Sequence, residues 1–227
     1  MEKKICLVST IVNNKYVDDF INQVFEISSR HNILSILSTC QLDIIRKVSS
    51  TRRNYDNAKV VTILYSRKMP DWYKKPDRVW DIVYGRNLAR KRAIELRCDY
   101  VFYIDSDVFV ELDLPIRMFN LMDRLKLNVL FHLVPFENHV ALFSSALFMV
   151  DNYALKKLFF GCYQDIVDEN NVVVEDDILM FKIGVLNLRV ATCSLSDVKH
   201  KNLIHKKRNE LIFLDPTVKI ISKARIK

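Results

Sequence analysis

The sequence predicts one α/β domain built on a mainly parallel, doubly wound central sheet. Apolar, β-rich runs alternate with helix-forming runs four times in the first half of the chain. The chain has 227 residues, of which 50% are hydrophobic, and this suits a compact domain with a sizeable core. No stretch rich in Pro, Gly or Ser marks a linker to a second domain.

The first half of the chain supplies the strand–helix repeats. Each expected strand is short and apolar, and each expected helix has apolar residues close to helical spacing. The expected strands span residues 4–11, 32–37, 59–65 and 100–104, and the expected helices span 17–28, 42–48 and 86–96. The irregular stretch before the third helix contains Pro70, Trp72, Pro76 and Trp80, and it predicts a surface loop over a pocket.

The second half of the chain is less regular and predicts a small antiparallel portion of the sheet. Helices are expected at 114–125, 153–160 and 178–185, and strands at 128–134, 139–150, 172–174 and 188–193. We expect the domain to span residues 1–200. Residues 201–227 then form a basic C-terminal extension.

Positive charge is concentrated at the end of the chain. The net charge is +8, and residues 199–227 carry nine Lys or Arg against two acids. A tail of this kind attracts phosphates, anionic lipid headgroups or nucleic acid. A solvated tail without a specific partner is an equally good interpretation.

Cysteine usage and hydropathy predict a soluble, cytoplasmic protein. The five cysteines are scattered and include no C-x-x-C pair, so we expect free thiols in a reducing cytosol. Polar residues interrupt the longest apolar region, 129–150, before it reaches the length that spans a bilayer. The apolar start of the chain fits a buried strand better than a signal peptide.

Asp105-Ser106-Asp107 directly follows the expected strand 100–104, at the end of a parallel strand, where α/β sheets bind ligands. In an extended segment residues i and i+2 point the same way, so the two carboxylates would converge on one hard divalent cation. The alternative is an ordinary turn, since Asp and Ser are common turn residues. Apolar runs on both sides favour the metal, because buried charges need a partner.

Two further groups are candidates for chemistry. Glu175-Asp176-Asp177 stands at an expected strand-to-helix junction. Acids there are either the residues that commonly occupy the first turn of a helix or a general base that the helix dipole keeps ionised. His200 is a candidate metal ligand, and His205 is a second one. A solvated histidine in a basic tail is the alternative for both.

The order of these features resembles the GT-A glycosyltransferases, near the family 2-like group and its small viral and microbial members. The resemblance covers residues 4–200. Its most specific part is residues 85–108, GRNLARKRAIELRCDYVFYIDSDV, which is similar to the helix and strand that carry the DxD motif of that family. The acidic triplet and the histidine match less specifically.

The resemblance implies a single Rossmann-like GT-A domain that moves a sugar from a nucleoside-diphosphate sugar to a glycan, protein or lipid-linked acceptor. It implies Asp105, Asp107 and His200 as ligands of Mn²⁺ or Mg²⁺. It implies Asp176 as the catalytic base of an inverting reaction, with Glu175 near the acceptor and Asp177 as the other candidate base. The donor-binding residues that it implies are Thr10, Val12, Arg86, Asn87, Asp105, Ser106, Ser144 and Ser145.

The chain departs from this family directly after the second expected strand. Many members carry an acid directly after the second strand, where this chain has Ser38-Thr39-Cys40, so the nucleotide stays open. One alternative function is a sugar-phosphate nucleotidyltransferase, although residues 9–15 lack the glycines of such enzymes. The other is a non-catalytic protein that binds nucleic acid or a membrane surface through the basic tail. We expect no specific nucleic-acid partner, and we expect peripheral membrane contact through the tail.

Overall fold

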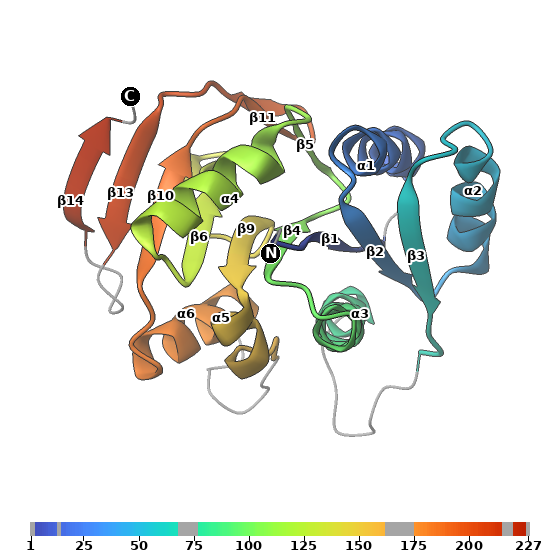
Figure 1. Ribbon diagram of the computed structural model, residues 1–227, viewed down its shortest axis with the longest axis horizontal. Helices are drawn as coiled ribbons and strands as arrows, with labels where there is room; N and C mark the ends of the chain where they lie inside the picture. The colour runs from blue at the N-terminus through green and yellow to red at the C-terminus, as the bar shows by residue number, and fades with distance from the viewer. Residues whose placement is uncertain (1–2, 13–14, 68–76, 162–174, 215–219, 226–227) are drawn as a thin grey trace.

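A nine-stranded sheet forms the centre of the computed structural model (Figure 1). The structure describes residues 3–12, 15–67, 77–161, 175–214 and 220–225, and of residues 77, 175–177 and 220–225 it describes the backbone alone. In chain order the strands of this sheet are β1 (Ile5–Thr10), β2 (Leu34–Thr39), β3 (Lys59–Leu64), β4 (Tyr100–Ile104), β6 (Val129–His132), β9 (Leu147–Asp151), β10 (Val190–Ser194), β13 (Glu210–Leu214) and β14 (Ile220–Arg225). Across the sheet their order is β14-β13-β10-β6-β9-β4-β1-β2-β3.

The strand directions confirm the predicted sheet. β1 pairs in parallel with both β2 and β4, β2 pairs in parallel with β3, and β6 does so with β10. β9 and β13 run against their neighbours, so the antiparallel portion lies in the second half of the chain, as expected. Two small sheets complete the fold: β5 (Val108–Val110) with β11 (Val198–His200) and β12 (Leu203–His205), and β7 (Val134–Phe136) with β8 (His139–Ala141).

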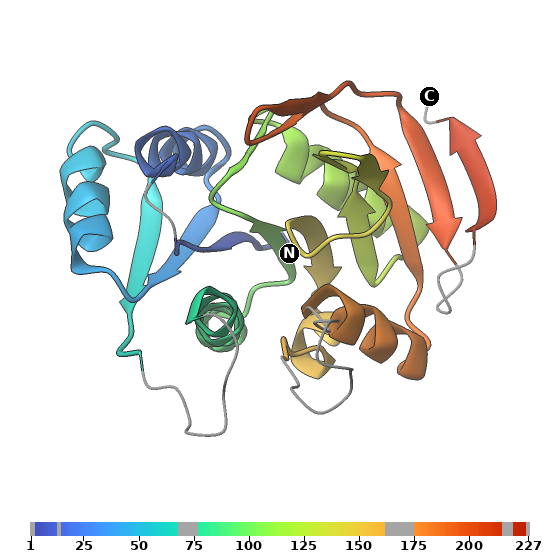
Figure 2. The same cartoon turned by 180° about the vertical axis from the view of Figure 1, so that it is seen from behind.

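Helices cover both faces of the central sheet, as Figures 1 and 2 show from opposite sides. One face carries α1 (Val17–His31), α2 (Leu42–Arg52) and α4 (Leu114–Leu125), and the other carries α3 (Asp77–Glu95), α5 (Asn152–Lys157) and α6 (Glu175–Val185). Successive residues of a strand point to opposite faces. Phe102 of β4 therefore joins the core under α1 and α4, whereas Val101 and Tyr103 join the core under α3, α5 and α6. This is the doubly wound layering that the sequence predicts.

The sequence places most elements within a few residues of their observed bounds, and the structure corrects two of them. α3 begins at Asp77, so residues 77–85, expected in a surface loop, are helical. The single strand expected at 139–150 is divided into β8 and β9 by residues 142–146. The expected strand at 172–174 lies outside the described residues.

The residues after His200 take part in the fold. β12 pairs with β11, and β13 and β14 form one edge of the central sheet. Leu211, Ile212 and Leu214 of β13 are buried. The part of the chain expected as a basic extension thus contributes apolar side chains to the core.

Cys6 and Cys98 form a disulfide, so the expectation of free thiols throughout is wrong. The pair is separated by 92 residues, and the parallel pairing of β1 with β4 brings the two Cα atoms to 6.0 Å. Sequence spacing gives no sign of a contact made by strand pairing. Because disulfides are typical of oxidising compartments, the cysteines do not support the expected cytoplasmic location. None of the described helices has both the length and the apolar composition needed to cross a bilayer.

Gly85 sets how closely α3 lies on the sheet. A Cβ atom built on Gly85 would stand 2.5 Å from Cγ2 of Thr10 and 3.0 Å from Oγ of Ser38, and the side chains of Thr10 and Ser38 are hydrogen-bonded to each other at 2.8 Å. Only a glycine lets the helix approach the ends of β1 and β2 at this distance. The next residue of the helix is Arg86, so this contact also positions the buried arginine described below.

We predict that Gly85→Ala lowers the free energy of unfolding by about 1–3 kcal/mol, because the added methyl group overpacks a buried contact. Urea unfolding measures the change. Adding Thr10→Ser, which removes Cγ2, should restore part of the loss. An alanine variant as stable as the parent, or a double variant no more stable than Gly85→Ala, would contradict this close approach.

Candidate active site

Asp105-Ser106-Asp107 forms the turn that leaves the central sheet at the end of β4. The amide of Val108 donates to the carbonyl of Asp105 at 3.1 Å, and the amide of Asp105 donates to the carbonyl of Ala146 at 2.8 Å. The segment is a turn, so the expectation of an extended segment is wrong. The chain must turn here because β4 belongs to the central sheet, whereas β5 pairs with β11 in a separate one.

The Asp105 carboxylate faces Arg86, whose side chain is 2% exposed. Nη2 of Arg86 donates to Oδ1 of Asp105 at 2.5 Å and to the carbonyl of Ser145 at 3.0 Å, and Nη1 donates to Oγ of Ser145 at 2.6 Å. The guanidinium also lies 5.2 Å from the ring centroid of Phe160. A buried guanidinium needs partners of this kind, and they hold it in one orientation. Arg86, Asp105 and Ser145, all predicted to bind the donor, are thus brought together.

The Asp107 carboxylate faces His200 instead. Oδ2 of Asp107 lies 3.7 Å from Nε2 of His200, because β11 pairs antiparallel with β5 and places His200 opposite Val108. Nδ1 of His200 lies 2.8 Å from the carbonyl of Pro135. A carbonyl only accepts hydrogen bonds, so Nδ1 carries the proton that donates to it and Nε2 is directed at Asp107.

The two groups perturb each other's protonation. Burial alone would raise the pKa of the Asp107 carboxyl, but His200 and Lys201 outweigh it and hold this pKa below its usual range. Burial alone would lower the pKa of the His200 imidazole, but Asp107 and the Pro135 carbonyl raise it above its usual value. The pair is therefore electrostatically coupled although it is far apart in sequence.

The structure distinguishes the two candidate histidines. His205 is also buried, but its Nε2 lies 3.1 Å from Oγ of Ser194, and no described acid of the Asp105–Asp107 turn contacts it. Burial and then Arg208 lower the pKa of His205. Its position fits a structural role, so the geometry favours His200 at the site.

A divalent cation fits the Asp107–His200 pair in part. Among the described residues, no three His, Cys, Asp or Glu side chains are grouped closely enough to hold a metal by themselves. Two ligands of one Mn²⁺- or Mg²⁺-sized ion lie about 3–4 Å apart, since each is about 2.1 Å from the ion. The 3.7 Å gap between Asp107 and His200 has this size. The hydrogen bond from Nδ1 to a carbonyl is the outer contact that usually orients a metal-binding histidine.

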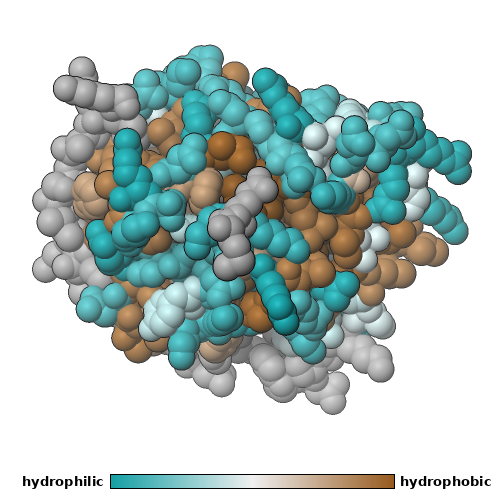
Figure 3. Space-filling model, viewed as in Figure 1, coloured by the Kyte–Doolittle hydropathy of each residue, from teal (hydrophilic) through white to brown (hydrophobic). Residues whose placement is uncertain are grey.

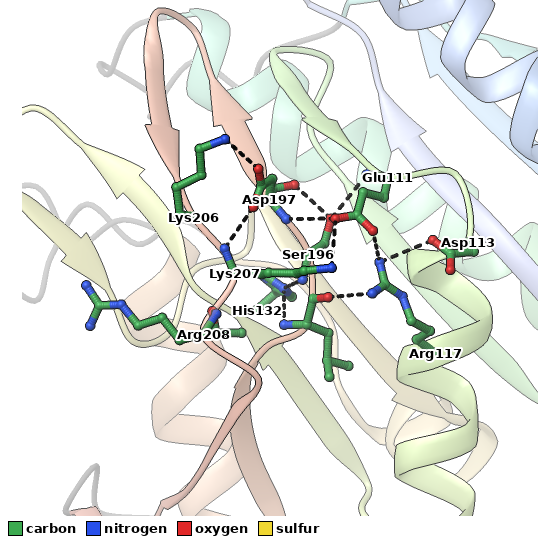
Figure 4. A network of polar contacts seen from close by, with 11 residues as sticks. Glu111, Asp113, Arg117, His132, Ser196, Asp197, Lys206, Lys207 and Arg208 are labelled. Carbon is green, nitrogen blue, oxygen red and sulfur yellow. Dashed lines mark hydrogen bonds and ion pairs between the residues drawn. The ribbon is translucent and has the colours of Figure 1, made fainter. Parts of the chain in front are cut away.

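A polar network fixes the strands that carry the pair (Figure 4). Glu111, just after β5, accepts from Nη2 of Arg117 at 2.5 Å and from the amide of Asp197 at 3.3 Å. Nη1 of Arg117 donates to the carbonyl of Leu195 at 2.6 Å, and the amide of Glu111 donates to Oγ of Ser196 at 3.1 Å. The loop before β11 is thereby tied to the end of β5 and to α4, which sets the register that brings His200 to Asp107.

His132 holds the same loop from beneath (Figure 4). Its Nε2 accepts from the amides of Leu195 and Ser196 at 2.9 and 3.1 Å, and its Nδ1 lies 3.0 Å from the carbonyl of Leu133. An imidazole that accepts at Nε2 must be neutral. Burial lowers the pKa of His132 to about 4. His205 and Arg117 also lower this pKa, whereas the hydrogen bond with the Leu133 carbonyl raises it. Sequence analysis missed this residue, because a histidine at the end of an apolar strand carries no distinguishing pattern.

The other predicted donor residues lie around the turn, but several have structural contacts. Thr10 is buried against Ser38, and the carbonyl of Val12 accepts from the side chain of Gln41 at 3.1 Å. Asn87 exchanges two hydrogen bonds with the backbone of Phe160. The remaining two, Ser106 and Ser144, are buried.

The acidic triplet opens α6, as predicted. The helix begins at Glu175, so the three acids occupy its first turn. The side chains of Glu175, Asp176 and Asp177 lie outside the described residues, and their roles stay predictions.

A buried acid reaches the end of β2 from elsewhere in the chain. Asp81 of α3 is 1% exposed, is paired with Arg67, and lies 3.6 Å from the thiol of Cys40. The hydroxyl of Tyr65 donates to the backbone carbonyl of Asp81 at 2.9 Å. Sequence reasoning missed this acid, because residues 77–85 were assigned to a loop. The segment Ser38-Thr39-Cys40 at the end of β2 contains no acid, but the fold brings the Asp81 carboxylate next to it.

A cavity of about 430 Å³ opens beside His200. It lies between the turn from β11 to β12, the β7–β8 hairpin and the segment before α1. Stacked rings of Phe136 and His139 form part of its wall, and Asn138 and Asn202 supply amide groups. This mixture of aromatic and amide groups suits a polar organic ligand close to the Asp107–His200 pair.

The fold is shared with solved structures of nucleotide-sugar-binding proteins. TarS residues 1–349 from S. aureus, also solved with UDP-GlcNAc, superposes with a TM-score of 0.57 at 17% identity over 85% of this chain. The mannosyltransferase PcManGT from Pyrobaculum calidifontis, solved with GDP-Man and Mn²⁺, superposes with a TM-score of 0.61 at 11% identity over 84% of this chain. The chain spans a little over half of each, 58% and 54%.

These similarities confirm a GT-A-like glycosyltransferase fold. The sequence itself matches no protein-family model and no curated protein. The shared fold does not by itself assign the DxD motif, the metal or the catalytic residues of this chain.

We predict that the stability of the protein falls by about 2 kcal/mol between pH 7 and pH 5 through His132 alone. The unfolded chain protonates this imidazole below about pH 6.5, whereas the folded chain resists protonation until about pH 4. Protons thus favour the unfolded state across this window. Urea unfolding at pH 7, 6 and 5 measures the slope.

His132→Gln is the matched variant, because its side-chain oxygen can accept the same amides without titrating. It should show a flatter pH dependence than the parent between pH 7 and 5. Equal slopes for the parent and this variant would refute a neutral His132 in the folded state.

Proposed function

We propose that this protein transfers a sugar from a nucleoside-diphosphate sugar to an acceptor hydroxyl with the help of Mn²⁺ or Mg²⁺. The observation that carries the proposal is the turn after β4, which directs Asp105 to a buried arginine and Asp107 to a histidine from a distant strand. The turn lies at the carboxyl ends of parallel strands, where α/β sheets bind nucleotides. The solved structures with this fold include complexes with UDP-GlcNAc and with GDP-Man and Mn²⁺.

Asp107 and His200 are the residues that would hold the cation, and the donor and water would supply its other ligands. Bound there, the cation would offset the negative charge that develops on the leaving nucleoside diphosphate. Lys201 adds a positive charge next to the pair, since its amide donates to the carbonyl of Asp107 at 3.1 Å and its side chain is exposed. This lysine was not among the predicted site residues, and it follows His200 directly in the sequence.

Arg86 positions the donor side of the site. It holds Asp105 and Ser145 in fixed orientations, and the Asp105 side chain, 30% exposed, is proposed to contact the ribose. We therefore assign Asp105 to the donor rather than to a cation shared equally with Asp107. Thr10, Val12, Asn87, Ser106 and Ser144 complete the proposed donor side.

Asp176 is the proposed general base. It takes the proton of the acceptor hydroxyl while the hydroxyl oxygen bonds to the anomeric carbon, and the bond from that carbon to the diphosphate breaks. Its position in the first turn of α6 supports this role, because the helix dipole keeps a carboxylate there ionised. Glu175 is proposed to contact the acceptor, and Asp177 is the second candidate base.

We predict that Asp107→Asn and His200→Gln each lower metal-dependent donor hydrolysis by about 100-fold or more, because each removes one protein ligand. His205→Gln is the matched control and should keep its metal dependence, since His205 contacts Ser194. Initial rates against Mn²⁺ concentration make the comparison. If His205→Gln failed like His200→Gln, or if Asp107→Asn kept parental turnover, the metal assignment would be wrong.

We predict that Asp176→Asn lowers kcat for transfer by about 10²- to 10⁴-fold and leaves donor affinity unchanged, because it removes only the proton acceptor. Calorimetric titration of the donor in the presence of Mn²⁺ measures the affinity. Asp177→Asn in the same helical turn is the matched control and should keep most of its activity. The opposite ranking of these two variants would move the base to Asp177.

A further inference from the structure

The face of the molecule formed by α3, α5 and α6 has large apolar side chains at its surface. Nine large apolar side chains are exposed in the described part of the chain, and five of them lie on these helices or just after α5. They are Tyr84 (39% exposed), Tyr153 (55%), Phe159 (44%), Phe181 (71%) and Val185 (68%). In Figure 3 brown side chains reach the surface at the lower left, where α5 and α6 lie in Figure 1. We call this surface the helical face.

Helical geometry makes these side chains point away from the core. In α6 the buried Leu179, Met180 and Ile183 pack on the sheet, and Phe181 and Val185, four residues apart, lie on the opposite side. In α5 the buried Ala154 and Leu155 pack on the same sheet face, and Tyr153, Lys156 and Lys157 lie opposite them. Because α5 and α6 cover the same face of the sheet, their outer sides form one surface.

The same surface is strongly basic. Lys91 and Arg92 of α3 are exposed together with Lys156 and Lys157 of α5. Among the described side chains of the three helices, Glu95 is the one exposed acid, and it is paired with Arg92 at 3.1 Å. Among the described side chains, positive charge on this surface therefore has few acidic partners. The side chains of the three acids at 175–177, in the first turn of α6, lie outside the described residues.

Two further cations of this surface, Arg90 and Lys182, contact backbone carbonyls. Arg90 donates to the carbonyls of Leu155 and Lys156 at 2.7 and 2.9 Å, and Nζ of Lys182 donates to the carbonyl of Phe159 at 2.9 Å. Burial and then Arg90 lower the pKa of Lys182 to about 8. An anion beside these two groups would relieve their mutual repulsion.

A groove of about 540 Å³ runs along the outer side of α3 within this face. Its apolar lining consists of Tyr84, Leu88, Ile94 and Phe159. Arg90 and Lys91 also line it. A groove with an apolar lining and neighbouring cationic side chains suits a ligand that has both a hydrocarbon part and an anionic group.

The opposite face of the sheet has a different surface. Of its three helices, α1 and α4 bear none of the nine exposed apolar side chains and α2 bears Leu42 alone. The α1 helix exposes Asp18, Asp19 and Glu26. Among the described residues, the combination of exposed aromatic side chains and lysines is therefore confined to one side of the molecule.

We propose that the helical face docks the protein on an anionic membrane surface, with Phe159, Phe181 and Val185 entering the interface and the surrounding lysines contacting lipid phosphates. Interfacial protein surfaces combine exposed apolar side chains with Lys and Arg in this way. A nucleic-acid surface would use the charge but leave Phe181 and Val185 without a function. The proposal places the contact on α3, α5 and α6 and not on the C-terminal tail, and it is independent of the proposed sugar transfer.

Vesicle co-sedimentation of the full chain tests this proposal. Vesicles of 70% phosphatidylcholine and 30% phosphatidylserine are compared with vesicles of phosphatidylcholine alone. We expect binding to the anionic vesicles that weakens with salt, and a partition coefficient at least about tenfold lower for Phe181→Ser/Val185→Ser and for Lys156→Gln/Lys157→Gln. Circular dichroism and urea unfolding establish that the variants remain folded.

Matched controls remove the same types of residue elsewhere. Leu42→Ser/Ile204→Ser replaces apolar side chains that are 52% and 60% exposed on other surfaces. Arg46→Gln/Arg53→Gln replaces an exposed cation of α2 and one directly after it. Both controls should bind vesicles like the parent.

Three results would overturn the proposal. One is equal binding by the helical-face variants and the controls. Another is loss of binding only when the tail cations at 219, 223, 225 and 227 are replaced by glutamine. The third is a dimer that Phe181→Ser/Val185→Ser converts to monomer, measured by sedimentation velocity, together with unchanged vesicle binding, which would make this face a self-association surface.

Discussion

The ion pair between Arg86 and Asp105 fixes the turn on which the rest of the site depends. Two carboxylates one residue apart repel each other, and a buried guanidinium satisfies the first of them from inside the protein. The second, Asp107, is then directed to the other side of the turn, toward His200. Asp105 is thus paired with a permanent cation, the Arg86 guanidinium. Asp107 faces a position that suits an exchangeable metal cation.

Several distant parts of the chain support this arrangement. Gly85 lets α3 lie close to β1 and β2, which brings Arg86 under the turn. The Glu111–Arg117 pair and the neutral His132 hold the loop that leads into β11. The Cys6–Cys98 disulfide joins the start of β1 to the residues that precede β4. Interactions made within the fold therefore set the distance between Asp107 and His200.

Much of the layout could be predicted from the sequence, because short apolar strands and amphipathic helices have distinct periods. β4 and α4 were predicted with their observed bounds, and the turn after β4 follows from the position of Asp105-Ser106-Asp107. The directions of the two carboxylates could not be predicted, since they depend on Arg86 and on the pairing of β5 with β11. The Cys6–Cys98 pair and the Asp81–Arg67 pair depend in the same way on contacts between elements. α3 was predicted too short, because Trp80 and the preceding prolines resemble loop composition.

The proposed Mn²⁺ or Mg²⁺ site lies between Asp107 and His200. A crystal of the protein grown with Mn²⁺ and a nucleoside diphosphate, measured for the anomalous scattering of manganese, tests this position most directly. We expect one manganese peak within about 2.3 Å of both the Asp107 carboxylate and Nε2 of His200, with Asp105 still bound to Arg86. A manganese ion on Asp105 with Arg86 displaced, or a bound nucleotide with no manganese at Asp107, would contradict the account.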